Sequence, residues 1–491
     1  MTKCNTQPLQ FQALGSRSVL AAFDGGNITS DAGALLLREV DGHFGFLERF
    51  ATCFTDHRDP ERIEHPLLDL LRQRVFGLCL GYEDLNDHDQ LRFDPLLAVA
   101  VGKTDPLGQD RPRTADQGKP LAGKSTLNRL ELTSVRASAD SRYKKTVAHM
   151  NKIEDYLVDT FLGQHASPPK RIVLDLDATD DRIHGHQLGR FFHGYYGDYC
   201  YLPLYIFCGD HPLCARLRPS DIDASCGALK QVQRIVAHIR RSWPNVKILL
   251  RGDSGFCREP LMRWCETQQV DYLFGLAKNK RLLKILGKEM HEAKQLHETT
   301  RQASRVFKDF TYQTKKSWCK ERRVVGKAEH LDKGANPRFV VTSLSMADFD
   351  AKHLYEQEYC GRGEMENRIK EQQLYLFADR TSCATMRANQ IRLYLSTVAY
   401  IVMRAVREYG LKDTDLEKAQ CNTIRTKLLK IGALIRVSVR RVLISLSEAY
   451  PFRELFTRVW ERLRALVTPF TSTPSGLGTP SATASSGSPS G

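Results

Sequence analysis

The chain has 491 residues, 42% of them hydrophobic, which predicts about three globular domains and excludes a chain too polar to fold. Its 72 Lys and Arg outnumber 57 Asp and Glu, and the net charge of +15 favours a polyanionic partner, nucleic acid ahead of a membrane surface. The apolar runs are too short to span a bilayer and the N-terminus lacks the apolar core of a signal peptide, so we expect a cytoplasmic protein without membrane segments.

Helical patterns dominate the first part of the chain, and we expect residues 1–135 to form a mainly helical region. Ser30 and Asp31 have the character of a helix N-cap ahead of an apolar run. Leucines at helical spacing predict a helix over 65–76. The polar segment 102–124, rich in Gly, Pro and Asp, predicts a loop.

The pattern changes to α/β in the middle of the chain. The order strand, strand, strand, helix, strand predicts an α/β core whose first part spans 165–277. The expected elements are strands 171–177, 200–207, 213–218 and 246–251 and helix 229–241. The second part of the core spans 339–408 and contains a charged helix.

Basic segments lie before and after this charged helix. The first, 278–338, carries two runs of alternating apolar residues, which predict a β-rich insertion. The second is the region 409–467, which we expect to be helical. An apolar helix is expected before it, over 390–408, and another within it, over 443–450. Residues 468–491 contain no charge and are rich in Ser, Thr, Pro and Gly, which predicts a disordered tail.

Two aspartates close the first strand of the core. Side chains alternate along a strand, so Asp175 and Asp177 emerge on one face while Leu174 and Leu176 point into the sheet packing. We favour Asp177 as the primary metal ligand because it stands at the strand end, with Asp175 as a secondary candidate. Alternatively, both are polar residues that begin a turn.

A later strand-like run ends at Asp253, after Gly252, which permits close approach of the backbone at the turn. The sequence Gly-Asp-Ser-Gly also matches the nucleophile segment of trypsin-like serine proteases, with Ser254 as nucleophile. The α/β order and the basic charge disfavour that class. A plain turn residue is the remaining interpretation of Asp253.

The charged helix carries the third acid. Arg362, Glu366 and Lys370 are four residues apart and therefore share one face, with Tyr359 at its edge. On that face Glu366 would bind a metal ion while Arg362 and Lys370 reach phosphates. A solvated, salt-bridged helix explains the same spacing.

Three other motifs could mark functional sites, but the sequence around them gives less support. Residues 118–125 satisfy the phosphate-loop spacing, but a polar, proline-containing segment precedes them instead of a buried strand. His184, His186 and His193 cluster after the first core strand, a spacing more often incidental in a loop than a metal site. Trp318, flanked by lysines, is either a platform for an unpaired DNA base or an ordinary strand tryptophan.

Together these residues resemble the DDE transposases of bacterial insertion sequences, in particular the family numbered thirteen-eighty, which is distantly related to the piggyBac-like elements. The resemblance covers most of the chain. It rests on 28–33, 175–179, 251–256, the signature Tyr359, Arg362 and Glu366, and the basic segment 429–441. Related transposases carry a lysine seven residues after the glutamate, where this chain has Gln373, with Lys370 one turn earlier.

The resemblance implies an RNase H-like catalytic core with a β-rich insertion, flanked by helical N-terminal and C-terminal regions. It implies that Asp177, Asp253 and Glu366 hold two Mg²⁺ ions, which Mn²⁺ can replace. The implied reaction is DNA cleavage at the element ends, followed by transfer of the 3′-hydroxyl strand into target DNA. A non-transposing nuclease and a catalytically inactive DNA-binding regulator are the alternatives.

The implied partners are the terminal inverted repeats and target DNA, bound by a homodimer in the bacterial cytoplasm at the nucleoid. We expect the helical N-terminal region to contact the repeats. The expected DNA-binding side chains are Tyr359, Arg362, Lys370, Trp318, Lys430, Arg440 and Arg441.

Overall fold

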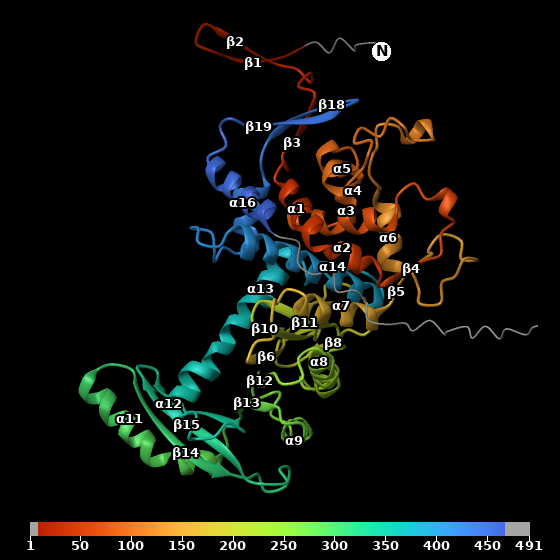
Figure 1. Cartoon of the computed structure of the whole chain (residues 1–491). Helices are drawn as coiled ribbons and strands as arrows, with labels where there is room; N and C mark the ends of the chain where they lie inside the picture. The colour runs from red at the N-terminus through yellow and green to blue at the C-terminus, as the bar shows by residue number, and fades with distance from the viewer. Residues whose placement is uncertain (1–7, 467–491) are drawn as a thin grey trace, which may run out of the picture.

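A computed structural model of the chain describes residues 8–466. Figure 1 shows a helical unit at one end, a mixed sheet in the middle and an extension of helices and strands at the other end. The run from α12 (Ala351–His353) to α13 (Gly363–Leu376) connects the extension to the helical unit. Among the described residues, none of the helices has the length and apolar character that crossing a bilayer requires.

Nine strands within residues 8–466 form the central mixed sheet. They are β6 (Arg171–Ala178), β10 (Leu204–Cys208), β11 (His211–Arg216), β12 (Lys247–Gly252), β13 (Asp271–Leu276), β14 (Ser304–Tyr312), β15 (Arg322–Leu331), β16 (Gly334–Ala335) and β17 (Arg338–Thr342). The order is β11-β10-β6-β12-β13-β17-β15-β14, with β16 paired to β15. Strands β6, β12 and β13 run parallel, and the other pairs are antiparallel.

Apolar side chains cover both faces of the sheet. On one face Leu174 and Leu250 are buried against α8 (Ala228–Ser242) and α9 (Glu259–Thr267). On the other face Leu249 packs against the segment that leads into α13. Burying one such leucine contributes about 1.5–3 kcal/mol, which explains why these alternating runs form strands in the middle of the sheet.

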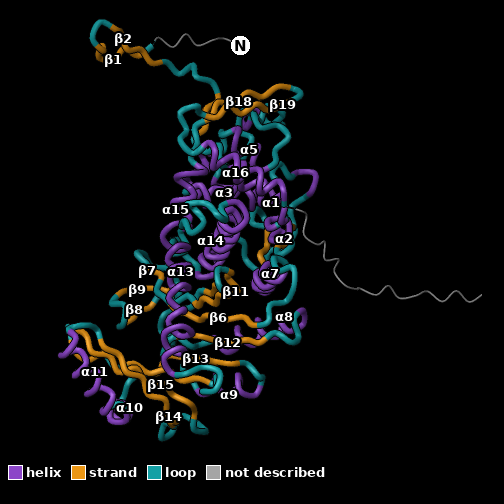
Figure 2. The backbone as a smooth tube through the Cα atoms, turned by 60° about the vertical axis from the view of Figure 1, so that its left-hand side comes forward, coloured by secondary structure: helices purple, strands orange, loops and turns teal. Residues whose placement is uncertain are grey.

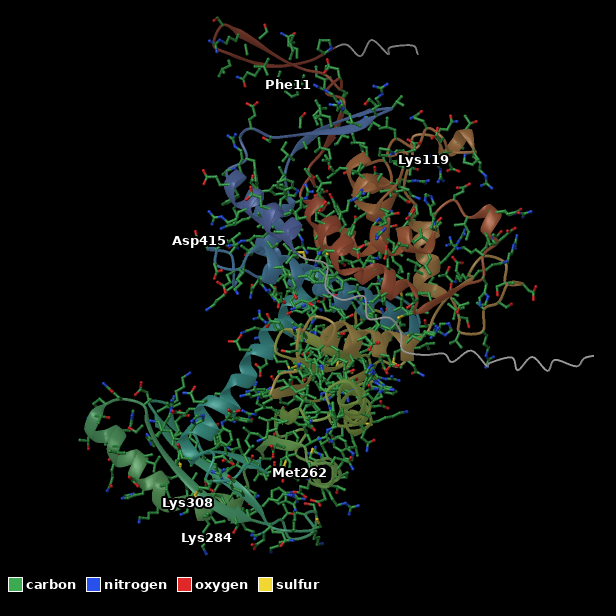
Figure 3. All side chains as sticks on the ribbon, viewed as in Figure 1. Phe11, Lys119, Met262, Lys284, Lys308 and Asp415 are labelled. Carbon is green, nitrogen blue, oxygen red and sulfur yellow. The ribbon has the colours of Figure 1, made fainter. Side chains whose placement is uncertain are left out.

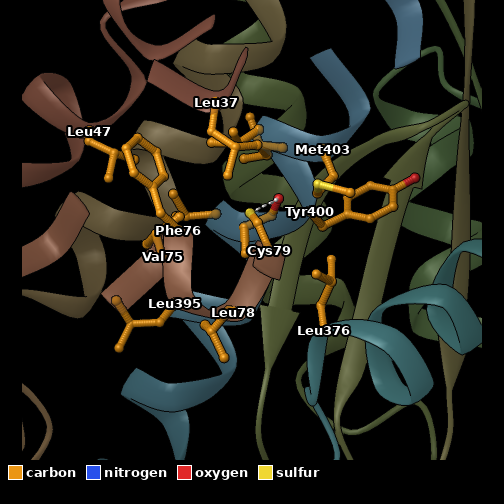
Figure 4. Packing of buried hydrophobic residues seen from close by; sticks show 14 of the residues in the cluster. Leu37, Leu47, Val75, Phe76, Leu78, Cys79, Leu376, Leu395, Tyr400 and Met403 are labelled. Carbon is orange, nitrogen blue, oxygen red and sulfur yellow. Dashed lines mark hydrogen bonds between the residues drawn. The ribbon is translucent and has the colours of Figure 1, made fainter. Parts of the chain in front are cut away.

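Helices from both ends of the chain form one unit around α14 (Met386–Ala405). They are α1 (Ala34–Phe44), α2 (Phe46–Ala51), α3 (Leu67–Leu80), α4 (His88–Leu91), α5 (Pro95–Val101), α6 (Lys124–Leu132), α7 (Met150–Leu162), α15 (Cys421–Ile424) and α16 (Arg453–Ala465). Figure 4 shows Leu37, Phe76 and Met403 in their shared core. The domain boundaries expected at residues 135 and 409 therefore separate segments that share one hydrophobic core.

The insertion contains helices as well as the strands expected of a β-rich module. It begins with α10 (Lys280–Ile285) and α11 (Gly287–Thr300), and only then forms the antiparallel pair β14 and β15. This pair extends the central sheet through β17. The helices escaped prediction because α11 buries few apolar side chains and its polar sequence lacks a clear apolar stripe.

Three smaller sheets flank these units in the described part of the chain. They are β1 (Leu9–Leu14) with β2 (Arg17–Ala21), β4 (Phe54–Asp56) with β5 (Thr146–Ala148), and β7 (Asp181–Arg182), β9 (Asp198–Tyr201) and β8 (Phe191–His193). The hairpin β1–β2, which carries the labelled Phe11, projects away from the helical unit (Figures 2 and 3).

The N-terminal strand β3 (Asn27–Thr29) pairs with the C-terminal strand β18 (Ala433–Ser438), which pairs with β19 (Arg441–Leu446). The helix expected over 443–450 is therefore wrong, because residues 443–446 belong to β19 and a turn follows over 447–450. The β-branched residues Val442 and Ile444 of β19 face Val437 and Ile435 across the pair, and this pairing outweighs the helical spacing.

An ion pair between a buried aspartate and a partly exposed lysine lies beside this sheet. The Lys430 ammonium is 2.6 Å from the carboxylate of Asp31, which also accepts a hydrogen bond from the Tyr82 hydroxyl. Asp31 therefore does not cap α1, whose N-cap is Gly33. The expected DNA contact of Lys430 stays a prediction, and the lysine would have to leave this carboxylate to bind a phosphate.

Gly33 fits against the C-terminal segment because it has no side chain. A Cβ at this position would lie 2.1 Å from the carbonyl oxygen of Leu428. We expect Gly33→Ala to lower the free energy of unfolding, measured in urea, by about 2–3 kcal/mol. Gly42→Ala is the control in the same helix, since a Cβ there meets nothing within 4 Å among the described residues. It should be neutral or stabilising by up to about 1 kcal/mol, and equal losses in the two variants would contradict the packing argument.

Candidate active site

Three acidic side chains from separate elements meet in one cleft. Asp177 is the penultimate residue of β6, Asp253 directly follows β12, and Glu366 lies in the first turn of α13. Because β6 and β12 are parallel neighbours, their carboxyl ends lie at the same edge of the sheet. The cleft has a volume of about 750 Å³ and is lined by all three acids.

The helix that supplies Glu366 changes form just before it. Residues Leu354–Tyr359 are π-helical, and Cys360–Arg362 form a 3₁₀ turn that leads into α13. Such π-helical segments are frequent at functional sites. The sequence spacing assumed one regular α-helix from Tyr359 onward and therefore missed this change of pitch.

Arg362 is the cation among the three acids. Its guanidinium lies 2.7 Å from the Glu366 carboxylate and 3.9 Å from that of Asp177, and its side chain is only 19% exposed. Burial alone would lower the pKa of Arg362, but the neighbouring carboxylates raise it above its ordinary value. The arginine therefore neutralises part of the negative charge in the cleft.

Burial raises the pKa of Asp177 to about 7. Arg362 opposes this rise, while the negative charges of Asp253 and Glu366 add to it. The cleft thus holds more negative charge than its one arginine balances, a state that a proton or a cation relieves.

The donor set fits a divalent metal ion. Carboxylate oxygens are the ligands that Mg²⁺ and Mn²⁺ prefer, and Asp177, Asp253 and Glu366 bring three carboxylates to one cleft. Within residues 8–466, no group of three His, Cys, Asp or Glu side chains is already arranged around a metal position. Arg362 lies between Asp177 and Glu366, so these side chains would have to close on an ion.

Asp175 has a different role from Asp177. It is the cross-strand neighbour of Arg251, and its two carboxylate oxygens accept hydrogen bonds of 2.5 and 2.8 Å from that guanidinium. Arg251 also donates to the backbone carbonyl of Glu358, in the π-helical segment. Both oxygens of Asp175 are thus engaged, which corrects its assignment as a secondary metal ligand.

Gln373 stands where related transposases have a lysine. Its amide nitrogen donates to the backbone oxygen of Asp180 at 3.1 Å and to the carboxylate of Asp181 at 2.8 Å. Asp181 is fully buried, and burial raises the pKa of its carboxyl to about 8. Gln373 therefore ties α13 to the residues that follow β6, while Lys370 lines the cleft and is exposed.

Trp318 is not an exposed platform for a base. Its ring packs edge-on against Tyr312, with centroids 5.8 Å apart, and the Arg322 guanidinium lies 5.4 Å from its centroid. The residue is 7% exposed, so the tryptophan belongs to the hydrophobic core and its expected contact with DNA is corrected. Arg440 and Arg441, in contrast, are exposed at the turn between β18 and β19.

The competing motifs do not form their sites. Residues 118–125 are preceded by no strand in the described segment 102–117, and the Asp89 carboxylate accepts a hydrogen bond from the Lys124 backbone nitrogen, where a phosphate would bind. Of the three clustered histidines only His193 lines the cleft. Ser254 also lines it, but makes no hydrogen bond to a histidine among the described residues.

The sequence analysis missed the aromatic side of the cleft. Tyr195 and Tyr196 line it together with the acids, and both come from the turn between β8 and β9. The available signal was the density of aromatic residues over 191–201.

Comparison with protein families matches residues 11–468 to the family described as transposase DDE domain group 1. A comparison with curated proteins gave no match.

The raised pKa of Asp177 predicts a pH-dependent stability. The folded state retains a proton that the unfolded chain loses, so this contribution is complete below the ordinary pKa near 4 and is lost as the pH rises through about 7. We expect Asp177→Asn to increase the free energy of unfolding at pH 8, in buffer without divalent cations, by on the order of 2–4 kcal/mol. At pH 4 the change should be small. Urea unfolding at both pH values checks this, with the exposed Asp110→Asn as control; equal gains at both pH values would contradict it.

The pair of Asp175 and Arg251 predicts strong coupling. We expect Asp175→Leu or Arg251→Met alone to lower the free energy of unfolding by about 3–5 kcal/mol, because each leaves a buried charge without its partner. The double variant should lose less free energy of unfolding than the two single variants lose together. Lys294→Ala, which removes an exposed ion pair with Glu298 at 3.7 Å, is the control and should cost less than about 0.5 kcal/mol. Additive losses in the urea measurement would refute the coupling.

Proposed function

The chain belongs to the family of transposases with a DDE domain of group 1, and we propose that it cleaves DNA at the ends of a mobile element and joins the freed 3′-hydroxyl to target DNA. One observation carries this proposal. Asp177, Asp253 and Glu366, from two strand ends and one helix, line a single cleft. Membership of the family makes the protein a transposase in general, and the two chemical steps are the proposal.

The strand order supports an RNase H-like catalytic core. Strands β11, β10 and β6 are antiparallel neighbours, and β12 and β13 continue parallel to β6. The helices and strands of the insertion lie in the chain between β13 and α13, ahead of the glutamate. This arrangement agrees with the core and insertion that the resemblance implies.

Asp177, Asp253 and Glu366 are the side chains that would hold two divalent ions, Mg²⁺ or Mn²⁺. When bound, such ions stabilise the charge on the attacking and leaving oxygens of an in-line displacement. Arg362 would then be released from at least one carboxylate. Its planar guanidinium suits a phosphate oxygen, so this arginine would pass from charge neutralisation to DNA binding.

The reaction has two displacements at phosphorus. First, a water oxygen attacks the scissile phosphate at the element end, the bond to the 3′-oxygen breaks, and that oxygen leaves as the 3′-hydroxyl. Second, this hydroxyl attacks a phosphodiester of target DNA and displaces its 3′-oxygen. Because both steps replace the 3′-oxygen on phosphorus by an incoming oxygen, from water in the first and from the freed hydroxyl in the second, one site can catalyse both.

The surroundings of the cleft are suited to DNA strands. Lys370 lines the cleft beside Glu366. An adjoining pocket of about 420 Å³ shares Asp253 and Arg362 with the cleft and is also lined by Tyr359, Lys278 and Arg338. Cations in the cleft and in this pocket would bind the phosphates that flank the scissile bond.

Contacts farther away would recognise the element. Arg440 and Arg441, exposed on the sheet β19-β18-β3, are placed to bind DNA phosphates outside the cleft. The adjacent helical N-terminal region is proposed to contact the terminal inverted repeats. Since an element has two ends, a homodimer would bring both ends together.

The central test replaces each acid in turn. We expect Asp177→Asn, Asp253→Asn and Glu366→Gln each to reduce Mg²⁺-dependent cleavage of a DNA fragment carrying the element ends by about a thousandfold or more, because each removes a ligand for the ions. Binding of the same DNA should be retained. Glu364→Gln is the matched control, since Glu364 lies on the same helix but does not line the cleft.

Two results would count against the proposal. Normal cleavage by any of the three variants would remove that residue from the site. Cleavage without joining of the cut end to a target plasmid would support a non-transposing nuclease instead.

A further inference from the structure

The small sheet β7-β9-β8 presents exposed aromatic rings beside the catalytic cleft. Tyr195 is 87% exposed and Phe192 is 59% exposed, and Phe191 and Tyr199 are also exposed. Apolar surface of this size in contact with water is unfavourable and marks binding sites. Figure 2 shows β8 and β9 projecting from the molecule beside α13.

The base of this sheet is firmly packed. Tyr201 is fully buried, and its hydroxyl donates a 2.6 Å hydrogen bond to the backbone oxygen of Leu188. The Ser220 hydroxyl donates to the backbone oxygen of Phe191 at 2.8 Å, and the Tyr196 hydroxyl donates to that of Ala178, next to Asp177, at 3.3 Å. These contacts hold the exposed rings in a fixed position relative to the catalytic acids.

The rings form two groups, one of which carries a cation. Tyr195 lies edge-on to Tyr196 with centroids 5.0 Å apart, and His193 lies 4.9 Å from Tyr196. The Arg190 guanidinium stands over Tyr199, 4.7 Å from its centroid. Aromatic rings interleaved with arginine bind single-stranded nucleic acid, because bases stack on the rings while the cation attracts phosphates.

The position of these rings in the cleft indicates which ligand they bind. His193, Tyr195 and Tyr196 line the same cleft as Asp177 and the other two acids, so whatever binds the rings is continuous with the reacting strand. Exposed Lys370, which also lines the cleft, complements a phosphate backbone. A base inside a duplex offers only its edges, whereas an unpaired base offers the flat face that a tyrosine can stack on.

We propose that Tyr195 stacks on an unpaired nucleotide next to the scissile phosphate and that the aromatic surface of residues 191–201 keeps this nucleotide out of the duplex. The inference rests on the proposed function, because that function places a DNA strand in the cleft. It assigns to this surface the base-binding role that buried Trp318 cannot fill.

The test measures DNA binding in buffer without divalent cations, so that no cleavage is required. One probe is a duplex with a short run of unpaired thymidines at one end, and the other is the same duplex fully paired. We expect the protein to prefer the probe with unpaired thymidines. Tyr195→Ala should reduce this preference about tenfold, whereas Tyr195→Phe should retain it, because the stacking ring remains.

Tyr143→Ala is the matched control, since Tyr143 is 56% exposed and lies outside the lining of the cleft. It should leave both affinities unchanged. Equal affinity of the unsubstituted protein for the two probes, or an equal loss on both probes with Tyr195→Ala, would overturn the inference. Failure of the proposed function has a separate signature, the absence of Mg²⁺-dependent cleavage by the unsubstituted protein, and the binding comparison decides the inference in that case as well.

Discussion

The buried ion pair between Arg251 and Asp175 is the interaction on which the site depends. Asp175 lies two residues before Asp177 on β6, and Arg251 lies two residues before Asp253 at the end of β12, so their pairing sets the relative position of the two strand ends that carry the candidate acids. The third bond of Arg251, to the backbone of Glu358, adds the helix that carries the third acid. A bidentate guanidinium can join three elements in this way because its donors lie in one plane.

The charge balance of the cleft follows from this frame. The frame brings three carboxylates to one place with a single buried arginine, so burial and mutual repulsion disfavour full ionisation, and the pKa of Asp177 rises to about 7. Bound cations would balance this excess negative charge and so stabilise the ionised carboxylates. Arg362 lies between Asp177 and Glu366. If metal ions took its place, metal binding would release the Arg362 guanidinium to bind a phosphate.

The helix α13 connects this chemistry to the helical unit at the other end of the molecule (Figure 1). At its C-terminal end, buried Arg425 donates hydrogen bonds to the backbone oxygens of Tyr375 in α13 and of Cys79 in α3. Helix ends leave such carbonyls without partners, so one arginine stabilises two helices. The region proposed to recognise element ends is thus joined through Arg425 to the helix that carries Glu366.

The sequence by itself determined the local elements of the core and the candidate acids at their ends. The alternation around Asp175 and Asp177, and the apolar run before Asp253, reflect a period of two that depends on neighbouring residues alone. Only the tertiary structure decided that Asp175 pairs with Arg251, that Trp318 is buried and Lys430 pairs with Asp31, that 443–446 is a strand, and that Tyr195 borders the acids. Each of these depends on a partner far away in the chain, and local spacing contains no information about that partner.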